Sequence, residues 1–326
     1  MDLPVSATSL EHTLRQRQLW PLGSTPVEQS TSFSCHVLSV ETGSSNRLEL
    51  FLKDYSSSRL PKDGLAGRVE REVRVYRELL NAANLGTAAY YGAGPADSNG
   101  ATWLLLEYVP GVELRACGFE AYLHVAAWLG RLHAHFRTHP WKLNGADYLV
   151  NHDRDYFADM AKSALEAVRG YGLGLEERLA AVLEDYDDVI DRLIDPTPTL
   201  VHGSFRAQNI LLIEAGSAWR VCPVDWELAG LGSPYLDLAF LVDRWQGRRD
   251  MLLDAYGEGL SVCGMPVPDR RGLLEVIDRF RLHKMVKSLS SSLMKNYSVR
   301  SVTKILALAE RIRAAFVNHN TRGRGG

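Results

Sequence analysis

The chain has 326 residues, of which 46% are hydrophobic and 23% are charged, and its formal net charge at pH 7 is −2. This length allows a large core and fits two lobes or two domains better than one, and the composition is that of an ordinary globular protein. The small net charge excludes a general attraction to nucleic acid or to an anionic membrane surface.

The start of the chain and its cysteines show no targeting or metal-binding pattern. The opening segment MDLPVSATSLEHTLRQ lacks the basic start and apolar core of a secretory signal, and no apolar stretch reaches the roughly 20 residues that cross a bilayer. Cys35, Cys117, Cys222 and Cys263 form no C-x-x-C pair, which argues against a zinc site and a disulfide framework. We therefore expect a reduced, cytoplasmic protein with no membrane and no nucleic-acid partner.

The first third of the chain predicts a β-hairpin, a helix and a buried strand. FSCHVLSVE (33–41) and RLELFLKDY (47–55) have strand composition and are joined by the turn-forming sequence TGSSN. Segment 64–84 repeats apolar residues at helical spacing. Segment 102–110, TWLLLEYVP, is predicted to be a buried strand that ends at Pro110 and Gly111.

The rest of the chain predicts mostly amphipathic helix. The exception is segment 199–224, which contains short strand-like runs around turns. We expect a boundary near Val109 to Leu114 and a disordered tail, NHNTRGRGG, from about residue 318. The expected helices cover residues 119–136, 153–169, 176–195, 271–293 and 299–317.

Two charged residues stand out in the β-rich part. Alternation along LELFLK places Phe51 and Lys53 on the face opposite the leucines. Glu72 lies within the apolar stripe of the following helix, and a buried carboxylate needs a partner, for which Lys53 is the candidate. The alternatives are a solvated strand end for Lys53 and a stripe-edge position that reaches water for Glu72.

Another pair of polar residues follows the strand-like runs of segment 199–224. The loop HGSFRAQN (202–209) ends in Asn209, and Asp225 follows the next run. Oxygen atoms of Asn and Asp presented from adjacent loops suit Mg²⁺, which binds few protein ligands together with substrate phosphates. Taken singly, Asn209 fits a turn and Asp225 fits a helix cap, so the interpretation depends on Lys53, Glu72, Asn209 and Asp225 occurring in this order.

That order resembles the aminoglycoside phosphotransferase and choline kinase-like family, which shares the protein-kinase fold. The resemblance covers about 27–312 and extends to the segments WLLLEYV, AWLGRLHAHF and GSPYLDLA. It implies an α+β, two-lobed protein-kinase-like fold. A small β-rich N-lobe over 1–109 would bind the nucleotide, and a larger helical C-lobe over 110–326 would carry the catalytic loop, the metal site and the acceptor site.

The resemblance also implies ATP and Mg²⁺ as cofactors, a small-molecule hydroxyl as acceptor, and a role for each site residue. His202 and Asp237 would shape the catalytic loop. The remaining implied roles are phosphate binding by Lys53, orientation of that lysine by Glu72, adenine contact by the backbone from Glu107 to Val109, and Mg²⁺ binding by Asn209 and Asp225.

The catalytic loop departs from the family at Ser204, where relatives carry an acidic residue that accepts the proton of the acceptor hydroxyl. A serine hydroxyl is not basic at neutral pH, so the expected base is absent. A general base contributes about 10² to 10⁴-fold, while positioning and charge neutralisation carry most of phosphoryl transfer. Arg206 could supply compensating charge, or it is simply a solvent-facing loop arginine, and Glu227 is a candidate for a displaced base.

Two further departures concern the nucleotide pocket. Phe51 stands where the family has a smaller residue that faces adenine, and the loop STSFS (30–34) contains no glycine. Two hypotheses therefore stand. The chain is an ATP- and Mg²⁺-dependent phosphotransferase with an atypical catalytic loop, or it is a catalytically weak or inactive pseudokinase that serves as a nucleotide-binding or scaffold protein.

Overall fold

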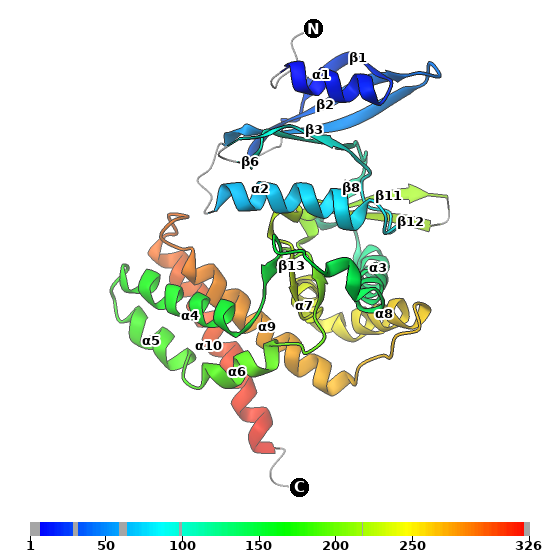
Figure 1. Cartoon of the computed structure of the whole chain (residues 1–326). Coiled ribbons are helices and arrows are strands. Elements are labelled where there is room, and N and C mark those ends of the chain that lie inside the picture. The colour runs from blue at the N-terminus through cyan, green and yellow to red at the C-terminus, as the bar shows by residue number, and fades with distance from the viewer. Residues whose placement is uncertain (1–6, 29–31, 59–63, 98–99, 217, 323–326) are drawn as a thin grey trace.

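The computed structural model describes residues 7–28, 32–58, 64–97, 100–216 and 218–322 of the chain. Figure 1 shows a β-rich N-lobe next to a larger helical C-lobe, with helix α2 (Leu65–Arg74) between the sheet and the C-terminal helices. This arrangement confirms the predicted two-lobed α+β fold.

The N-lobe is built on an antiparallel sheet with the strand order β1-β2-β3-β7-β4. Strands β2 and β3 form the predicted hairpin, and β7 is the predicted buried strand beside β3. Helix α1 (Ala7–Gln16) and strand β1 lie outside the elements that we predicted from sequence. The strands of this lobe are β1 (Leu19–Pro26), β2 (Phe33–Thr42), β3 (Arg47–Ser58), β4 (Tyr90–Ala93), β5 (Ala96–Asp97), β6 (Gly100–Ala101) and β7 (Trp103–Glu107).

The two faces of β3 bury different groups. Leu50 and Leu52 are fully buried in a cluster with the leucines of α1, on one face of the sheet. Lys53 and Tyr55 point to the other face, where both contact Glu72 of helix α2. The period of two along a strand therefore assigns the aliphatic side chains to the outer core and the lysine to the interlobe side.

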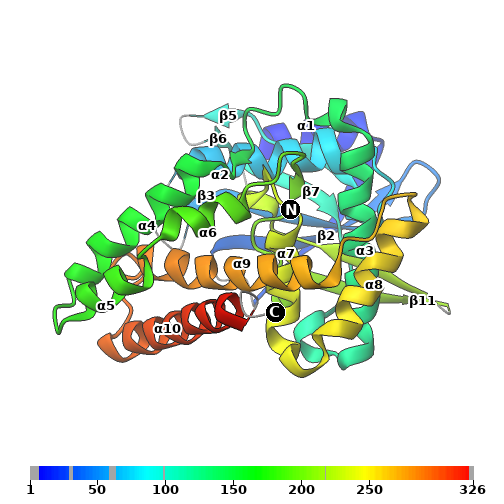
Figure 2. The ribbon, with the colours of Figure 1, turned by 90° about the horizontal axis from the view of Figure 1, so that it is seen from below.

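The C-lobe is formed by helices that pack in pairs, α3 against α8 and α4 against α9. Figure 2 shows α9 through the middle of this lobe, with α10 on one side and α4 and α6 on the other. Within the described ranges, each helix is too short or too polar to span a membrane. These helices are α3 (Phe119–Thr138), α4 (Arg154–Arg169), α5 (Leu175–Val182), α6 (Tyr186–Leu193), α7 (Tyr235–Val242), α8 (Arg249–Val262), α9 (Arg270–Ser290) and α10 (Val299–Arg322).

The single helix expected over 176–195 is wrong, because the chain forms two helices, α5 and α6, in this segment. Asp185 between them has φ 54° and ψ 29°, a left-handed conformation that ends one helix and redirects the next. Helices α7 and α8 were not among the predicted elements. Helix α10 extends to Arg322, beyond the expected start of the tail, and residues 323–326 lie outside the described part of the chain.

Short strands in the C-lobe carry the loops of interest, and β10, β11 and β12 confirm the strand-like runs predicted in segment 199–224. The hairpin β11–β12 pairs with β8, which follows the N-lobe sheet directly. Strand β13 pairs with β10 and with β9. Their bounds are β8 (Val112–Glu113), β9 (Val150–Asn151), β10 (Thr199–Val201), β11 (Ile210–Ala215), β12 (Ala218–Pro223) and β13 (Gly230–Gly232).

The loop between β10 and β11 is held in shape by a buried carboxylate. Asp237, in the first turn of α7, accepts hydrogen bonds from the backbone N–H groups of His202 at 2.6 Å and Gly203 at 3.0 Å. Gly203 has φ 73°, and a β-carbon at this position would lie 2.1 Å from the carbonyl oxygen of Leu228. Glycine is therefore required here by both conformation and space.

Replacing Gly203 by alanine should lower the free energy of unfolding by more than about 2 kcal/mol, because a β-carbon is strained in the left-handed region and meets fixed backbone. Gly118→Ala is the matched control, since nothing lies within 4 Å of a β-carbon there. Urea unfolding of both variants checks the prediction. Equal stabilities of the two variants would contradict it.

Two histidines are buried between α4, α9 and β13. His152 is 5% exposed and packs edge-on against Tyr156 at 4.6 Å between ring centroids, and His283 packs edge-on against Phe157 at 4.7 Å. Burial, followed by the positive charge of Lys287, lowers the pKa of His152 to about 3 and lowers the pKa of His283 well below its ordinary value. Both rings are therefore neutral in the folded protein at neutral pH.

Stability should fall as the pH drops below about 6.5, because the unfolded chain then takes up protons that the folded histidines resist. The contribution of His152 is fully present above the unfolded pKa of about 6.5 and decreases by about 1.4 kcal/mol per pH unit toward pH 3. Denaturant unfolding at pH 7.5, 6.0 and 5.0 measures this slope. His152→Asn should flatten the slope, whereas exposed His124→Asn should leave it unchanged; equal slopes in both variants would contradict the prediction.

Candidate functional site

A lysine amine is shared by two carboxylates where the lobes meet. The Nζ atom of Lys53 lies 2.7 Å from Oε2 and 3.0 Å from Oε1 of Glu72, and 2.8 Å from Oδ1 of Asp225. Glu72 comes from helix α2 in the N-lobe, whereas Asp225 follows strand β12 in the C-lobe. The sequence prediction that Lys53 and Glu72 are partners is therefore met in the geometry, and Asp225 joins them.

The three groups of this contact differ in their access to solvent. The side chains of Lys53 and Glu72 are 9% and 3% exposed, whereas that of Asp225 is 40% exposed. Tyr55 donates a hydrogen bond of 2.8 Å to Glu72, and this contact was not predicted. Although burial alone would lower it, the charges of Asp225 and Glu72 raise the pKa of Lys53 well above its ordinary value. Lys53 is therefore a fixed cation at neutral pH.

Asn209 and Asp225 are brought together by the base of the β11–β12 hairpin. The backbone N–H of Val224 donates to the carbonyl oxygen of Asn209 at 2.8 Å, which ties the two loops side by side. Asp225 has φ 67° and ψ 58°, a left-handed conformation that is uncommon for a residue other than glycine. Among the described residues, no three His, Cys, Asp or Glu side chains are arranged to hold a metal ion by themselves.

The backbone carbonyl of Ser204 accepts hydrogen bonds, whereas its side-chain hydroxyl makes none among the described residues. The Ser204 carbonyl oxygen accepts hydrogen bonds from Asn209 Nδ2 at 3.1 Å and from the Arg206 N–H at 2.7 Å. Within the described part of the chain, the Ser204 hydroxyl has no hydrogen-bond partner and Arg206 has no carboxylate partner. The guanidinium carbon of Arg206 lies 5.8 Å from the ring centroid of Phe240.

Glu227, the candidate for a displaced base, is held by two arginines of helix α2. Arg68 contacts its carboxylate at 3.2 Å, and Arg71 donates to its carbonyl oxygen at 2.6 Å and to the carbonyl oxygen of Tyr148 at 2.8 Å. Glu227 is 8% exposed. Sequence patterns gave no sign of these arginines, which connect α2 to the segment after Asp225.

Strand β7, which leads into the C-lobe, is held to the β11–β12 hairpin by one arginine. Arg220 of β12 makes a two-point ion pair with Glu107 at 2.5 and 2.7 Å and donates to the carbonyl oxygens of Gly86 and Thr87 at 2.8 and 3.2 Å. The hydrogen bonds from Arg220 lower the pKa of Glu107. The side chain of Glu107 is therefore engaged in structure.

At Val109, two residues after Glu107, the backbone carbonyl and the backbone N–H differ in their hydrogen bonding. The carbonyl oxygen of Val109 accepts a hydrogen bond from the Gly111 N–H at 2.8 Å. Among the described residues, the Val109 N–H has no hydrogen-bond partner, and Val109 is 6% exposed. Of the predicted loop over 30–34, residues 30 and 31 lie outside the described part of the chain.

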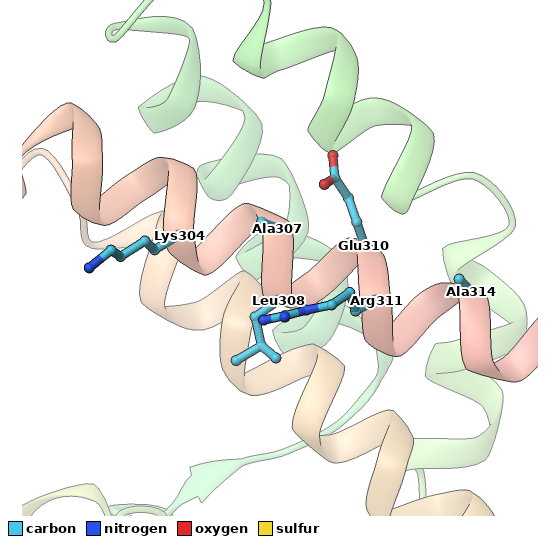
Figure 3. Close-up of a pocket in the computed structure, with 6 residues that line it drawn as sticks. All are labelled: Lys304, Ala307, Leu308, Glu310, Arg311 and Ala314. Carbon is cyan, nitrogen blue, oxygen red and sulfur yellow. The ribbon is translucent and has the colours of Figure 1, made fainter.

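A shallow pocket along helix α10 contains none of the predicted site residues (Figure 3). Glu310 in this pocket points toward α5, where Arg178 binds it through two contacts of 2.8 Å. Since a single helix supplies every lining residue, the pocket is an open groove on the C-lobe surface. The lining residues are Lys304, Ala307, Leu308, Glu310, Arg311 and Ala314.

Solved structures with this fold include several phosphotransferases. A mutant aminoglycoside 2'-phosphotransferase-IIIa in its GDP complex is 15% identical, with a TM-score of 0.63, and the match covers 96% of this chain and 99% of that one. Choline kinase LicA from Streptococcus pneumoniae is 14% identical, with a TM-score of 0.59 and coverage of 94% and 98%. Macrolide 2'-phosphotransferase MphH from Brachybacterium faecium is 17% identical, with a TM-score of 0.57 and coverage of 93% and 97%.

The two sequence comparisons gave different results. A search of curated proteins found no match. The profile of the phosphotransferase enzyme family (APH) matches residues 32–274, which include Lys53, Glu72, Asn209 and Asp225. Because this match spans well over half of the chain and the fold agrees with it, the chain belongs to the phosphotransferase enzyme family.

Proposed function

We propose that the chain is an ATP- and Mg²⁺-dependent phosphotransferase that transfers the γ-phosphoryl group to a hydroxyl of a small molecule. The observation that carries this proposal is the position of Lys53, 2.7 Å from Glu72 of the N-lobe and 2.8 Å from Asp225 of the C-lobe. A fixed amine and a more exposed carboxylate at an interlobe boundary are the groups that a metal-bound triphosphate requires. On this proposal, the N-lobe over 1–109 supplies the nucleotide contacts. The C-lobe over 110–326 supplies the catalytic loop, the metal site and the acceptor site.

Named residues support each contact that the proposal requires with the phosphates and the adenine of the nucleotide. Lys53 would bind the α- and β-phosphates, with Glu72 and Tyr55 fixing its direction. The N–H of Val109 would donate to adenine, whereas Glu107 would contribute through its backbone, because Arg220 occupies its side chain. Relatives of this fold support a nucleotide ligand: one structure holds GDP, one of LicA holds AMP, and a streptomycin complex holds ATP.

Asn209 and Asp225 fit a Mg²⁺ ion. An amide oxygen and a carboxylate are hard oxygen donors, and their loops are joined at the Val224 to Asn209 hydrogen bond of 2.8 Å. Mg²⁺ usually takes one or two carboxylates and completes its coordination with water and substrate phosphates. When bound, the metal would neutralise charge on the phosphates. The Asp225 carboxylate would exchange its contact with Lys53 for a contact with the metal.

The transfer step uses few protein groups. The acceptor oxygen forms a bond to the γ-phosphorus as the bond from that phosphorus to the β–γ bridging oxygen breaks, and ADP leaves. The proton of the acceptor hydroxyl passes to solvent, because Ser204 is not a base. Arg206, in the same loop and without a carboxylate partner among the described residues, would offset negative charge on the transferred group.

Mg²⁺-ATP should stabilise the protein, by about 2.7 kcal/mol at a ligand concentration 100 times Kd. Asp225→Ala should weaken Mg²⁺-ATP binding by about tenfold or more, because the proposed metal contact is lost. It should affect metal-free ATP less, because that ligand does not use the metal contact, while the Lys53 contact is lost in both titrations. Isothermal titration of both ligands measures the difference. Asp187→Ala, at a carboxylate that is 84% exposed, should bind as wild type; unchanged Mg²⁺-ATP affinity in Asp225→Ala would remove that residue as a metal ligand.

The second candidate function is that of a pseudokinase that binds a nucleotide but transfers phosphate slowly or not at all. Ser204 favours it, because a hydroxyl stands where a proton acceptor is expected and makes no hydrogen bond to a base within the described residues. Glu227 does not remove this objection, since Arg68 already engages its carboxylate at 3.2 Å. Nucleotide binding without turnover would support this function.

Ser204→Asp should raise phosphate release from Mg²⁺-ATP by about 10² or more, because a carboxylate can accept the proton of water or of an acceptor hydroxyl. The assay uses hydrolysis, so it does not require the natural acceptor. Ser204→Asn has a similar size but no basic group, and it should not gain activity. If Ser204→Asp binds Mg²⁺-ATP and is no faster than wild type, the missing base is not what limits turnover.

A further inference from the structure

Asp237, the carboxylate that holds the backbone of the Ser204 loop (residues 202–209), has no exposed surface. It accepts hydrogen bonds from the backbone N–H groups of His202 at 2.6 Å and Gly203 at 3.0 Å. In the part of the chain that the structure describes, His133 is the only basic side chain within ion-pair distance of Asp237, with Nε2 3.8 Å from Oδ2. A buried charge is costly unless donors surround it, so the position of the proton on the His133 ring matters to Asp237.

The ring of His133 is also buried, and its other nitrogen faces helix α8. The Nδ1 atom lies 3.1 Å from the hydroxyl oxygen of Tyr256. Burial lowers the pKa of His133 and raises the pKa of Tyr256 well above its ordinary value, so at neutral pH the imidazole is neutral and the phenol keeps its proton. A neutral imidazole has one N–H group. When Tyr256 donates to Nδ1, that group is Nε2–H, and it faces the carboxylate of Asp237.

Helices α3 and α8 lie side by side (Figure 2), and each has a glycine where their backbones approach most closely. A β-carbon at Gly130 of α3 would lie 2.3 Å from the carbonyl oxygen of Tyr256, and one at Gly259 of α8 would lie 2.0 Å from a carbonyl oxygen of α3. Thr199 of β10 donates a hydrogen bond of 3.1 Å to the carbonyl oxygen of His133. The ring is therefore held between α3, α8 and the strand that leads into the Ser204 loop.

The Ser204 loop carries groups that the proposed function needs. Ser204 directly follows Gly203, and its carbonyl oxygen accepts a hydrogen bond of 3.1 Å from Nδ2 of Asn209. This contact uses the nitrogen of the amide and directs its oxygen, Oδ1, away from the Ser204 carbonyl, as a metal ligand requires. A displacement of Gly203 would therefore move Ser204 and turn the amide of Asn209.

We propose that His133 is a positioning residue whose Nε2–H group holds the Asp237 carboxylate where it fixes the backbone of the Ser204 loop. The separation of 3.8 Å is longer than a hydrogen bond, so the interaction is that of an N–H dipole with a charge, which is strong where water is excluded. The value of the loop for phosphoryl transfer rests on the proposed function, whereas its position does not. His135, two residues further along α3, has a different environment, because its Nε2 lies 3.1 Å from Nζ of Lys142.

Amide hydrogen exchange with single-residue resolution tests this role without nucleotide or acceptor. His133→Leu removes the N–H group and should speed exchange at the His202 and Gly203 amides by about tenfold or more, because their acceptor is held less firmly. His133→Gln keeps an N–H group at a similar reach and should restore most of the protection. His135→Gln is the matched control and should exchange as wild type at both amides.

The amides of strand β3, in the other lobe, are the internal reference. Unchanged exchange at His202 and Gly203 in His133→Leu, or an equal rise in β3 and in the loop, would overturn the proposal. Tyr256→Phe is a milder second variant, because it removes the donor to Nδ1 and keeps an aromatic ring in place. It should raise exchange at the same two amides even if His133→Leu does not fold, and wild-type exchange in Tyr256→Phe would also overturn the proposal.

Nitrogen-15 NMR of labelled imidazoles locates the proton, with His133→Gln assigning the His133 signals. The proposal requires the proton on Nε2 at pH 7.5, and a proton on Nδ1 instead would overturn it. His133→Leu should weaken Mg²⁺-ATP binding through Asn209, whereas His135→Gln should not. Absence of Mg²⁺-ATP binding by wild type would count against the proposed function, while the exchange and NMR results would still decide the role of His133.

Discussion

The buried contact of Lys53 with Glu72 and Asp225 is the interaction on which the arrangement of the lobes depends. An unpaired charge in the interior is costly, so Lys53 and Glu72 require each other once the sheet and α2 pack together. The third partner, Asp225, belongs to the other lobe. A single amine therefore links the β-rich sheet, helix α2 and the base of the β11–β12 hairpin.

Around this contact, arginines of one lobe donate hydrogen bonds to acceptors of the other. Arg68 and Arg71 of α2 reach the segment after Asp225, and Arg220 of the C-lobe hairpin reaches Glu107 and nearby carbonyl oxygens. Guanidinium groups suit this task because their donors are fixed in a plane and match carboxylate oxygens at two points. Directed polar contacts thus assemble the site from both lobes, above an apolar cluster that runs from α2 and the inner face of the sheet into the C-lobe. A second, smaller cluster fills the outer face of the N-lobe sheet.

Features with a local periodic signal could be predicted from sequence, and features that depend on distant contacts could not. Alternation along β3 and the helical stripe of α2 made Lys53 the candidate partner of Glu72, and the two side chains are in contact. The break at Asp185 was missed because the apolar pattern continues through both α5 and α6, so periodicity alone gives no sign of a left-handed residue. Arg71 and Arg220 were missed because each contacts residues far away in the chain, and an isolated basic residue carries no spacing pattern.

The clamp between Arg220 and Glu107 has a mechanical consequence. Asn209 precedes strand β11 and Asp225 follows strand β12, so both proposed metal ligands stand at the open end of one hairpin. Arg220 belongs to that hairpin and forms a two-point ion pair with Glu107. Glu107 is the last residue of β7, the strand that leads from one lobe to the other. If the lobes rotate relative to each other about strand β7, Asn209 and Asp225 move as one unit. The distance between these two residues is then preserved, while their distance from the amine of Lys53 changes.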